Sequence, residues 1–294
     1  MNRLKPFSYF EPASIKEAVE ILTEKEEAFP LAGGTDLLVR MKRGDIHPHV
    51  LVNLKSIDAL RVITIETEKG ASIGALTSIA DIEKSPVIKT NYPVLAQAAG
   101  VLGAPSIRNL ATIGGNVGRA SPASDMAPAL SVLKARVIVE GPKGKRDVGM
   151  NEIFTGPGRT TLSKSEIISC FYLPVSPVNT GSAYLKLGRR TGGGDCALVG
   201  VAALLTLQNG SPENVRIVLS SVGPKPIRAH TAEALLKNGS LDDHHIKAAA
   251  RAASEEVNPI TDLRCSASYR KKMVSVLTYR ALKQSLQRAK GERS

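Results

Sequence analysis

The chain has 294 residues, enough for two or three domains, and its content of 43% hydrophobic and 22% charged residues is that of a folded protein. No run of about 18 apolar residues occurs, so no membrane-spanning helix is expected. The net charge of +12 comes from scattered Lys and Arg without an RNA-recognition or helix-turn-helix pattern, so an acidic partner surface or an anionic cofactor explains it better than nucleic acid.

The first part of the chain alternates short strands and helices. Residues 14–24 predict an amphipathic helix with a capping box made by Ser14 and Glu17. A strand, a glycine turn and a helix start are expected within 29–44. Further strands are expected at 49–57, 60–67, 71–75, 135–141 and 166–173, and helices at 77–85 and 91–103. The strand at 49–57 is predicted to alternate in burial, and Thr77 is predicted to cap the helix at 77–85.

The segment LPVSPVNTGS, rich in Pro, Ser and Gly, marks a predicted domain boundary near residue 177. Strands are then expected at 183–189, 196–210 and 215–223, and helices at 231–239, 242–257 and 266–286. The pattern predicts an α+β protein with domains at 1–177 and 178–294, the second being a sheet with helices on one face. The first domain divides further into sub-blocks of about 1–56 and 57–177.

The segment Ala32-Gly33-Gly34-Thr35-Asp36 lies where a strand ends and a helix begins. Glycines let successive amides point into one concavity, and the N–H groups at a helix start favour phosphate. Taken alone, such a segment is more often a plain strand–helix turn. It is neither a P-loop nor a dinucleotide fingerprint, because the Gly-Lys-Ser/Thr ending and the GxGxxG pattern are missing.

A second segment repeats this chemistry about eighty residues later. Thr112-Ile113-Gly114-Gly115-Asn116 offers amides, a hydroxyl and a carboxamide, and Ser121, Ser124 and Asp125 add hydroxyls and a carboxylate. Hydroxyls and amides suit phosphate, whereas a carboxylate suits sugar hydroxyls. If the two segments converge, they would hold a ligand with a diphosphate and a polyol. The alternative is two tight turns, with Ser124 or Asp125 capping the helix that follows.

Other candidates for chemistry are weaker. The three cysteines, Cys170, Cys196 and Cys265, form no CxxC pair, so a disulfide framework, structural zinc or a self-contained iron–sulfur cluster is not expected. Cys196 is expected in the core. The adjacent His244 and His245 diverge on a helix and cannot easily share a metal, so no metal site is predicted. No nucleophile–base constellation or acidic dyad indicates a hydrolase, and no catalytic side chain is assigned.

Several motifs together resemble the flavin-binding subunits of molybdenum hydroxylases, the family of the carbon monoxide dehydrogenase medium subunit and of the FAD subunits of bacterial xanthine and nicotinate dehydrogenases. They are AGGTDLL, IRNLATIGGN and ASPASDMAP in the first part of the chain and KLGRRTGGGDCALVGVAA, PIRAHTAEALL and YRKKMVSVLTYRAL in the second. The resemblance covers nearly the whole chain. It implies a two-part FAD-binding domain of the vanillyl-alcohol-oxidase or PCMH type, followed by a C-terminal domain with an antiparallel sheet and helices.

The resemblance also implies FAD as the cofactor and assigns residues to it. Ala32–Asp36 and Thr112–Asn116 would wrap the diphosphate, and Ser121, Ser124 and Asp125 would lie at the polyol chain. Lys186 matches a lysine near the flavin ring, and Leu102 a position where some relatives place an aromatic over the flavin. Ile168 would pack on the adenine or ring side, and the loop Thr191–Asp195 would lie beside the flavin as a mobile gate.

By the same resemblance, the chain would be the electron-transfer subunit of a three-part dehydrogenase. A large partner would carry a molybdenum-pterin cofactor and a small partner [2Fe–2S] clusters, and electrons would leave to an external acceptor. A dimer of heterotrimers is expected, in the cytoplasm, with peripheral membrane association through the complex left open. Two alternatives remain from the residues alone: a non-redox nucleotide-binding regulatory module, and a standalone flavoenzyme.

Overall fold

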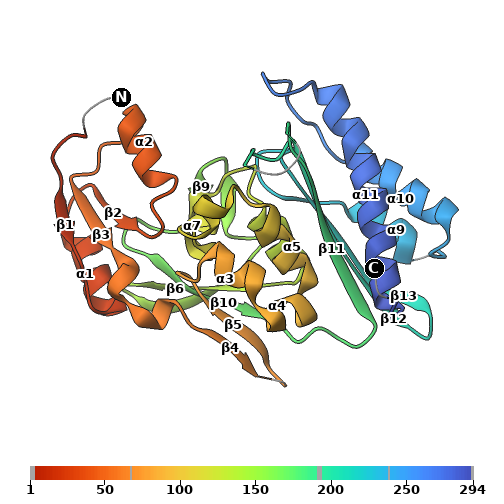
Figure 1. The fold of residues 1–294 in the computed structure, drawn as a ribbon, viewed down its shortest axis with the longest axis horizontal. Coiled ribbons are helices and arrows are strands. Elements are labelled where there is room, and N and C mark those ends of the chain that lie inside the picture. The colour runs from red at the N-terminus through yellow and green to blue at the C-terminus, as the bar shows by residue number, and fades with distance from the viewer. Residues whose placement is uncertain (1–3, 67, 191–193, 238, 293–294) are drawn as a thin grey trace.

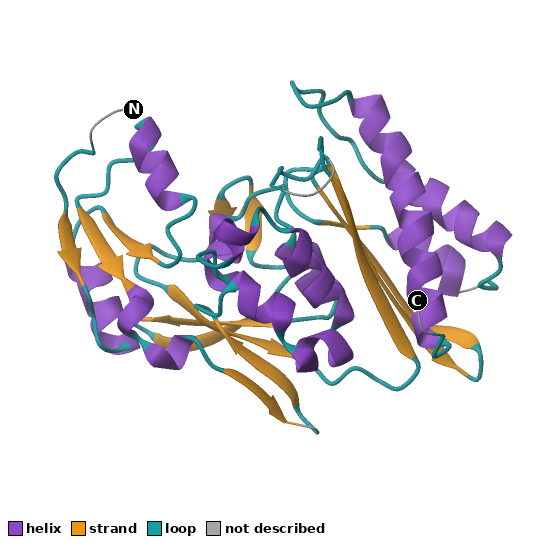
Figure 2. Ribbon diagram, in the orientation of Figure 1, coloured by secondary structure: helices purple, strands orange, loops and turns teal. Residues whose placement is uncertain are grey.

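The computed structural model describes residues 4–66, 68–190, 194–237 and 239–292. Three blocks follow one another across the molecule (Figure 1). A small sheet holds the N-terminal residues, a larger sheet with several helices lies in the middle, and a third sheet backed by long helices forms the C-terminal block. Figure 2 shows that the helices of the middle block lie between its own sheet and the C-terminal sheet.

The N-terminal block is a parallel sheet in the order β1-β3-β2 with two helices. Its elements are β1 (Ser8–Phe10), α1 (Ile15–Glu24), β2 (Ala28–Leu31), α2 (Leu37–Arg43) and β3 (Val50–Asn53), followed by short 3₁₀ turns at Leu54–Ser56 and Asp58–Leu60. All four residues of β3 are buried, so the predicted alternation in this strand is wrong. The reason is that β3 is the central strand of a parallel sheet covered on both faces.

Local sequence signals set the helix ends of this block. Ser14 Oγ accepts the amide of Glu17 at 3.2 Å, and the Glu17 carboxylate accepts the Ala13 amide at 2.8 Å, so the predicted capping box holds α1. Helix α2 ends at Gly44, whose φ of +82° is left-handed and closes the last turn.

The middle block is an antiparallel sheet in the order β4-β5-β10-β6-β7. Its strands are β4 (Ile63–Glu66), β5 (Gly70–Gly74), β6 (Arg136–Gly141), β7 (Gly144–Gly149) and β10 (Ile167–Leu173), with a small hairpin of β8 (Phe154–Gly156) and β9 (Arg159–Thr160). Its helices are α3 (Ile79–Lys84), α4 (Pro86–Asn91), α5 (Pro93–Val101), α6 (Pro105–Arg108), α7 (Ile113–Arg119) and α8 (Met126–Val132). Ser78 rather than the predicted Thr77 caps α3, because Ser78 Oγ accepts the Asp81 amide.

The C-terminal block is an antiparallel sheet in the order β11-β12-β13-β14, with helices α9 to α11 on one face. Its elements are β11 (Thr180–Leu187), β12 (Val199–Gln208), β13 (Ser211–Ser220), β14 (Ile227–Arg228), α9 (His230–Lys237), α10 (Asp243–Glu255) and α11 (Ala267–Ala289). Val201 and Ala203 of β12 pack toward the helices, whereas Ala202 and Leu204 pack toward the middle block. The sheet is therefore buried on both faces, which explains the unbroken apolar run of β12.

None of the described helices is both long and apolar enough to cross a lipid bilayer.

A bidentate ion pair joins β7 to the start of β10. It should make the free energy of unfolding depend on pH in the acidic range. Arg146 Nε and Nη2 contact the two Glu166 oxygens at 2.6 and 2.8 Å, and chiefly this contact lowers the pKa of Glu166 to about 2. Because the folded pKa lies below the ordinary value of 4.5, the stabilisation is present above about pH 4.5 and disappears as the pH falls toward 2.

Glu166→Gln is therefore expected to lower the free energy of unfolding at neutral pH and to match the wild type at the acid end. Urea unfolding at several pH values measures this difference, with the exposed Glu24→Gln as the control. If the difference in unfolding free energy between Glu166→Gln and the wild type stayed constant as the pH fell, the ion pair would not be the source of that difference.

Candidate functional site

The first glycine segment connects β2 to α2. The amides of Gly33, Gly34, Thr35 and Asp36 donate no hydrogen bond to another described residue. Gly34 has a φ of +74°, which a side chain would strain. Four uncommitted amides in one turn leave the backbone able to donate to an anionic ligand.

The second segment forms the start of α7, and its amides at 113–116 are already paired. The amides of Ile113 and Gly114 donate to the carbonyls of Thr77 and Ala75 at 3.1 and 2.8 Å. Thr112 caps the helix, since its Oγ1 accepts the Gly115 amide at 3.1 Å. The polar atoms that this segment offers to a ligand are therefore mainly side-chain atoms, those of Asn116 among them.

The two segments meet in space, as the sequence predicted. A Cβ on Gly33 would lie 2.0 Å from the carbonyl oxygen of Leu110, and a Cβ on Gly115 would lie 3.6 Å from the Cβ of Ala32. Arg119 Nε, at the end of α7, contacts the Asp36 carboxylate at 2.7 Å. Gly33 is thus required for backbone-to-backbone contact between the segments, a packing role that the sequence did not indicate.

Asn116, at the end of the second segment, forms a small polar group with Ser124, and Ser121 lies in the same loop. Ser124 Oγ donates to Asn116 Oδ1 at 2.6 Å and accepts the Ala127 amide at 3.1 Å, so Ser124 rather than Asp125 caps α8. Ser121 Oγ accepts the Ala123 amide at 3.2 Å. These hydroxyls hold their own loop and keep further hydrogen-bonding capacity, because a hydroxyl has one donor and two acceptor sites.

Asp125 makes a buried contact with the C-terminal sheet. Tyr184 donates its hydroxyl to Asp125 Oδ1 at 2.8 Å, and Lys186 Nζ contacts Asp125 Oδ2 at 2.9 Å. Burial raises the pKa of the Asp125 carboxyl above its usual range, and the Lys186 charge opposes that rise. Burial and the neighbouring Asp125 raise the pKa of Tyr184 well above its usual value. Sequence reasoning missed Tyr184, although its i, i+2 spacing to Lys186 on a strand places both side chains on one face.

Leu102 and Ile168 lie at the two sides of this region. Lys186 Nζ donates to the carbonyl of Val101 at 3.0 Å, so Lys186 lies beside the end of α5 that Leu102 caps. Leu102 is only 8% exposed and presents little surface for stacking. Ile168 of β10 is buried, with its Cδ1 3.9 Å from the position of a Cβ on Gly118 of α7.

Two other predicted features, Cys196 and the loop 191–195, lie outside this site. Cys196 is exposed, so its predicted place in the core is wrong, because β12 begins only at Val199. Of the predicted gating loop 191–195, residues 191–193 lie outside the described residues, and the flanking Arg190 and Asp195 form an exposed ion pair at 2.7 Å.

The divergence expected for His244 and His245 is not what the structure shows. Together with Asp242, they bring one possible metal-ligating atom each within 4.8 Å of one another. Asp242 nevertheless already caps α10 by accepting the His245 amide at 2.9 Å, and the group is largely exposed.

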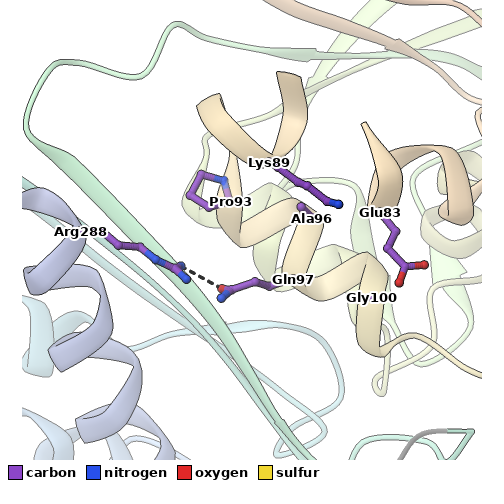
Figure 3. Close-up of a pocket in the computed structure, with 7 residues that line it drawn as sticks. All are labelled: Glu83, Lys89, Pro93, Ala96, Gln97, Gly100 and Arg288. Carbon is purple, nitrogen blue, oxygen red and sulfur yellow. Dashed lines mark hydrogen bonds between the residues drawn. The ribbon is translucent and has the colours of Figure 1, made fainter. Parts of the chain in front are cut away.

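A cavity of about 360 Å³ lies between the middle-block helices and α11 (Figure 3). Its lining residues are Glu83, Lys89, Pro93, Ala96, Gln97, Gly100 and Arg288. None of them belongs to the predicted site, so this cavity is separate from the meeting point of the two glycine segments.

Comparison with known proteins shows similarity along nearly the whole chain. Residues 5–176 match the family model "FAD binding domain in molybdopterin dehydrogenase", and residues 182–285 match "CO dehydrogenase flavoprotein C-terminal domain". The carbon monoxide dehydrogenase medium chain of Hydrogenophaga pseudoflava is 35% identical over 94% of this chain and 96% of its own. The glyceraldehyde dehydrogenase medium chain of Sulfolobus acidocaldarius is 33% identical over 95% of this chain and 98% of its own. A solved structure of the Hydrogenophaga carbon monoxide dehydrogenase superposes with a TM-score of 0.93 at 34% identity, covering 98% of this chain and 99% of that one.

Proposed function

Because this chain belongs to the family of FAD-binding subunits of molybdenum hydroxylases, we propose that it passes electrons from [2Fe–2S] clusters on a small partner subunit to an external acceptor. It is an FAD-binding oxidoreductase subunit, and its fold is that of the carbon monoxide dehydrogenase medium chain. In this proposal, substrate oxidation takes place on a large partner that carries the molybdenum-pterin cofactor.

The observation that carries the proposal is the meeting of residues 32–36 with residues 110–116. The four uncommitted amides of Gly33–Asp36 fit the diphosphate of FAD, since backbone N–H groups in a tight turn bind phosphate oxygens. Ala32 supports the same turn, and Thr112, Gly114, Gly115 and Asn116 form the wall opposite it. The pairing of the amides at 113–116 within the protein favours side-chain contacts from this wall.

The remaining residues are assigned to the rest of the cofactor. Ser121 and Ser124 are placed at the polyol chain, where hydroxyls exchange hydrogen bonds, and Ile168 and Leu102 supply apolar contact. Lys186 supplies a positive charge to the cofactor. Both Asp125 oxygens already have partners on β11, so Asp125 acts on the cofactor indirectly, by holding Lys186.

The chain's own residues perform binding and positioning rather than acid–base or nucleophilic chemistry. FAD, when bound, supplies the capacity to accept and release electron pairs. The protein's part is to hold that group rigidly at the junction of its blocks, in two domains that we place at 1–177 and 178–294. A dimer of heterotrimers in the cytoplasm is the assembly we propose.

Purification of the chain with its partners tests the function. The expected result is a yellow protein whose flavin is bleached by the substrate of the complex only when the molybdenum and iron–sulfur subunits are present. A colourless complex would favour a regulatory nucleotide-binding module instead. Bleaching of the isolated chain by a small molecule would favour a standalone flavoenzyme.

A further inference from the structure

A buried polar group joins the middle block to the C-terminal sheet at Asp125. The side chains of Asp125 and Lys186 are only 6% and 8% exposed, and Tyr184 is 3% exposed. Asp125 comes from the start of α8, whereas Tyr184 and Lys186 both come from β11. A carboxylate so deeply buried is stable only if both of its oxygens find donors, and here one neutral and one charged donor fill these places.

The sheet leaves room for Tyr184 in this position. Gly200 of β12 pairs with Lys186 across the strands, and a Cβ on Gly200 would lie 2.6 Å from the Tyr184 hydroxyl oxygen. Any larger residue at Gly200 would therefore displace the hydroxyl from Asp125. The absence of a side chain at Gly200 is thus what allows the Tyr184 hydroxyl to reach the Asp125 carboxylate.

Further hydrogen bonds fix β11 against α5. The Tyr184 amide donates to Gln97 Oε1 at 2.9 Å, and Arg288 of α11 donates to the same oxygen at 3.2 Å. Figure 3 shows Gln97 and Arg288 pointing toward one another across the gap between the helices. With the Lys186 contact to the Val101 carbonyl, these bonds hold the strand at both Tyr184 and Lys186.

We propose that Tyr184 is a positioning residue for the cofactor: its hydroxyl orients Asp125, and Asp125 in turn holds the Lys186 ammonium at the FAD site. This inference rests on the proposed function, because it takes Lys186 to lie beside the flavin. An ammonium has three N–H donors, and two of those on Lys186 are committed to Asp125 and Val101. The third has no acceptor among the described residues and remains available to the cofactor.

The charge balance of the group predicts the direction of the effect. Without the Tyr184 hydroxyl, Asp125 depends on Lys186 alone for compensation, so the ammonium is drawn more tightly to the carboxylate. Less positive charge then acts on the flavin, which gains negative charge on reduction. Reduction of the flavin therefore becomes less favourable, although a phenylalanine at position 184 would keep the apolar packing of the tyrosine ring.

The test is Tyr184→Phe in the assembled complex, compared with Tyr92→Phe. Tyr92 is an equally buried tyrosine in the middle block, with its hydroxyl on the Pro174 carbonyl at 3.1 Å, away from the proposed site. Spectroelectrochemical titration is expected to show the ratio of reduced to oxidised flavin at a fixed potential falling about threefold in Tyr184→Phe. This is a fraction of the roughly tenfold effect of removing a hydrogen bond to a charged group, because the hydroxyl acts on the flavin only through Asp125 and Lys186. Tyr92→Phe should leave this ratio unchanged, and both variants should retain FAD.

A double-mutant cycle with Asp125→Asn separates positioning from general structural damage. In the Asp125→Asn background, Tyr184→Phe should no longer change the ratio, because no carboxylate remains for the hydroxyl to orient. An equal change in both backgrounds, or a change no larger than that of Tyr92→Phe, would overturn the proposal. Absence of flavin from the wild-type complex would instead refute the proposed function itself.

Discussion

Replacing Gly33 with alanine is expected to remove most of the bound FAD from the protein. The new Cβ would lie 2.0 Å from the Leu110 carbonyl oxygen and 2.8 Å from its carbon. Both are backbone atoms, so no side chain can rotate away and the segments 32–36 and 110–116 must move apart. Because φ at Gly33 is not left-handed, the effect comes from lost space and not from backbone strain.

Overpacking of this kind is expected to lower the free energy of unfolding by about 2–3 kcal/mol. The ratio of flavin to protein absorbance measures the cofactor loss, and urea unfolding measures the stability loss. Gly156→Ala is the matched control, since a Cβ there meets no described atom within 4 Å. Full flavin content in a stable Gly33→Ala protein would show that the contact between the segments does not shape the FAD site.

Replacing Arg270 with methionine is expected to cause the largest loss of stability. Arg270 is 1% exposed, and its Nη1 donates to the carbonyls of Leu198 and Ser221 at 2.7 and 2.9 Å. Its Nη2 contacts Asp262 at 2.9 Å. Methionine keeps part of the volume but leaves these acceptors without their donor, at a cost of about 4 kcal/mol.

Arg264→Met provides the matched comparison, because Arg264 contacts the same carboxylate of Asp262 at 2.6 Å from a side chain that is 38% exposed. Its loss should change the free energy of unfolding by less than about 1 kcal/mol. Chemical denaturation of both variants checks the contrast. Equal effects of the two substitutions would show that burial does not govern the strength of this contact.

Local chemistry determined much of this protein. The cap at Ser14 and Glu17 and the amphipathic character of α1 depend on neighbours within a few residues, so the sequence predicted them correctly. The composition of the two glycine segments and the motifs around them were enough to predict the family, which the comparisons confirm.

Only the tertiary structure decided the features that depend on distant residues. The all-buried pattern of β3, the exposure of Cys196 and the capture of Asp125 by Tyr184 arise from contacts with other elements. Asp125 and Tyr184 lie 59 positions apart, and nothing in either local segment indicates the other. Burial and hydrogen-bond partners are set when separate elements pack. Each polar group that becomes buried must then form its hydrogen bonds with groups of the neighbouring element. For that reason the sequence could propose that two glycine segments converge, but only the folded chain showed that Gly33 closes on the backbone of Leu110.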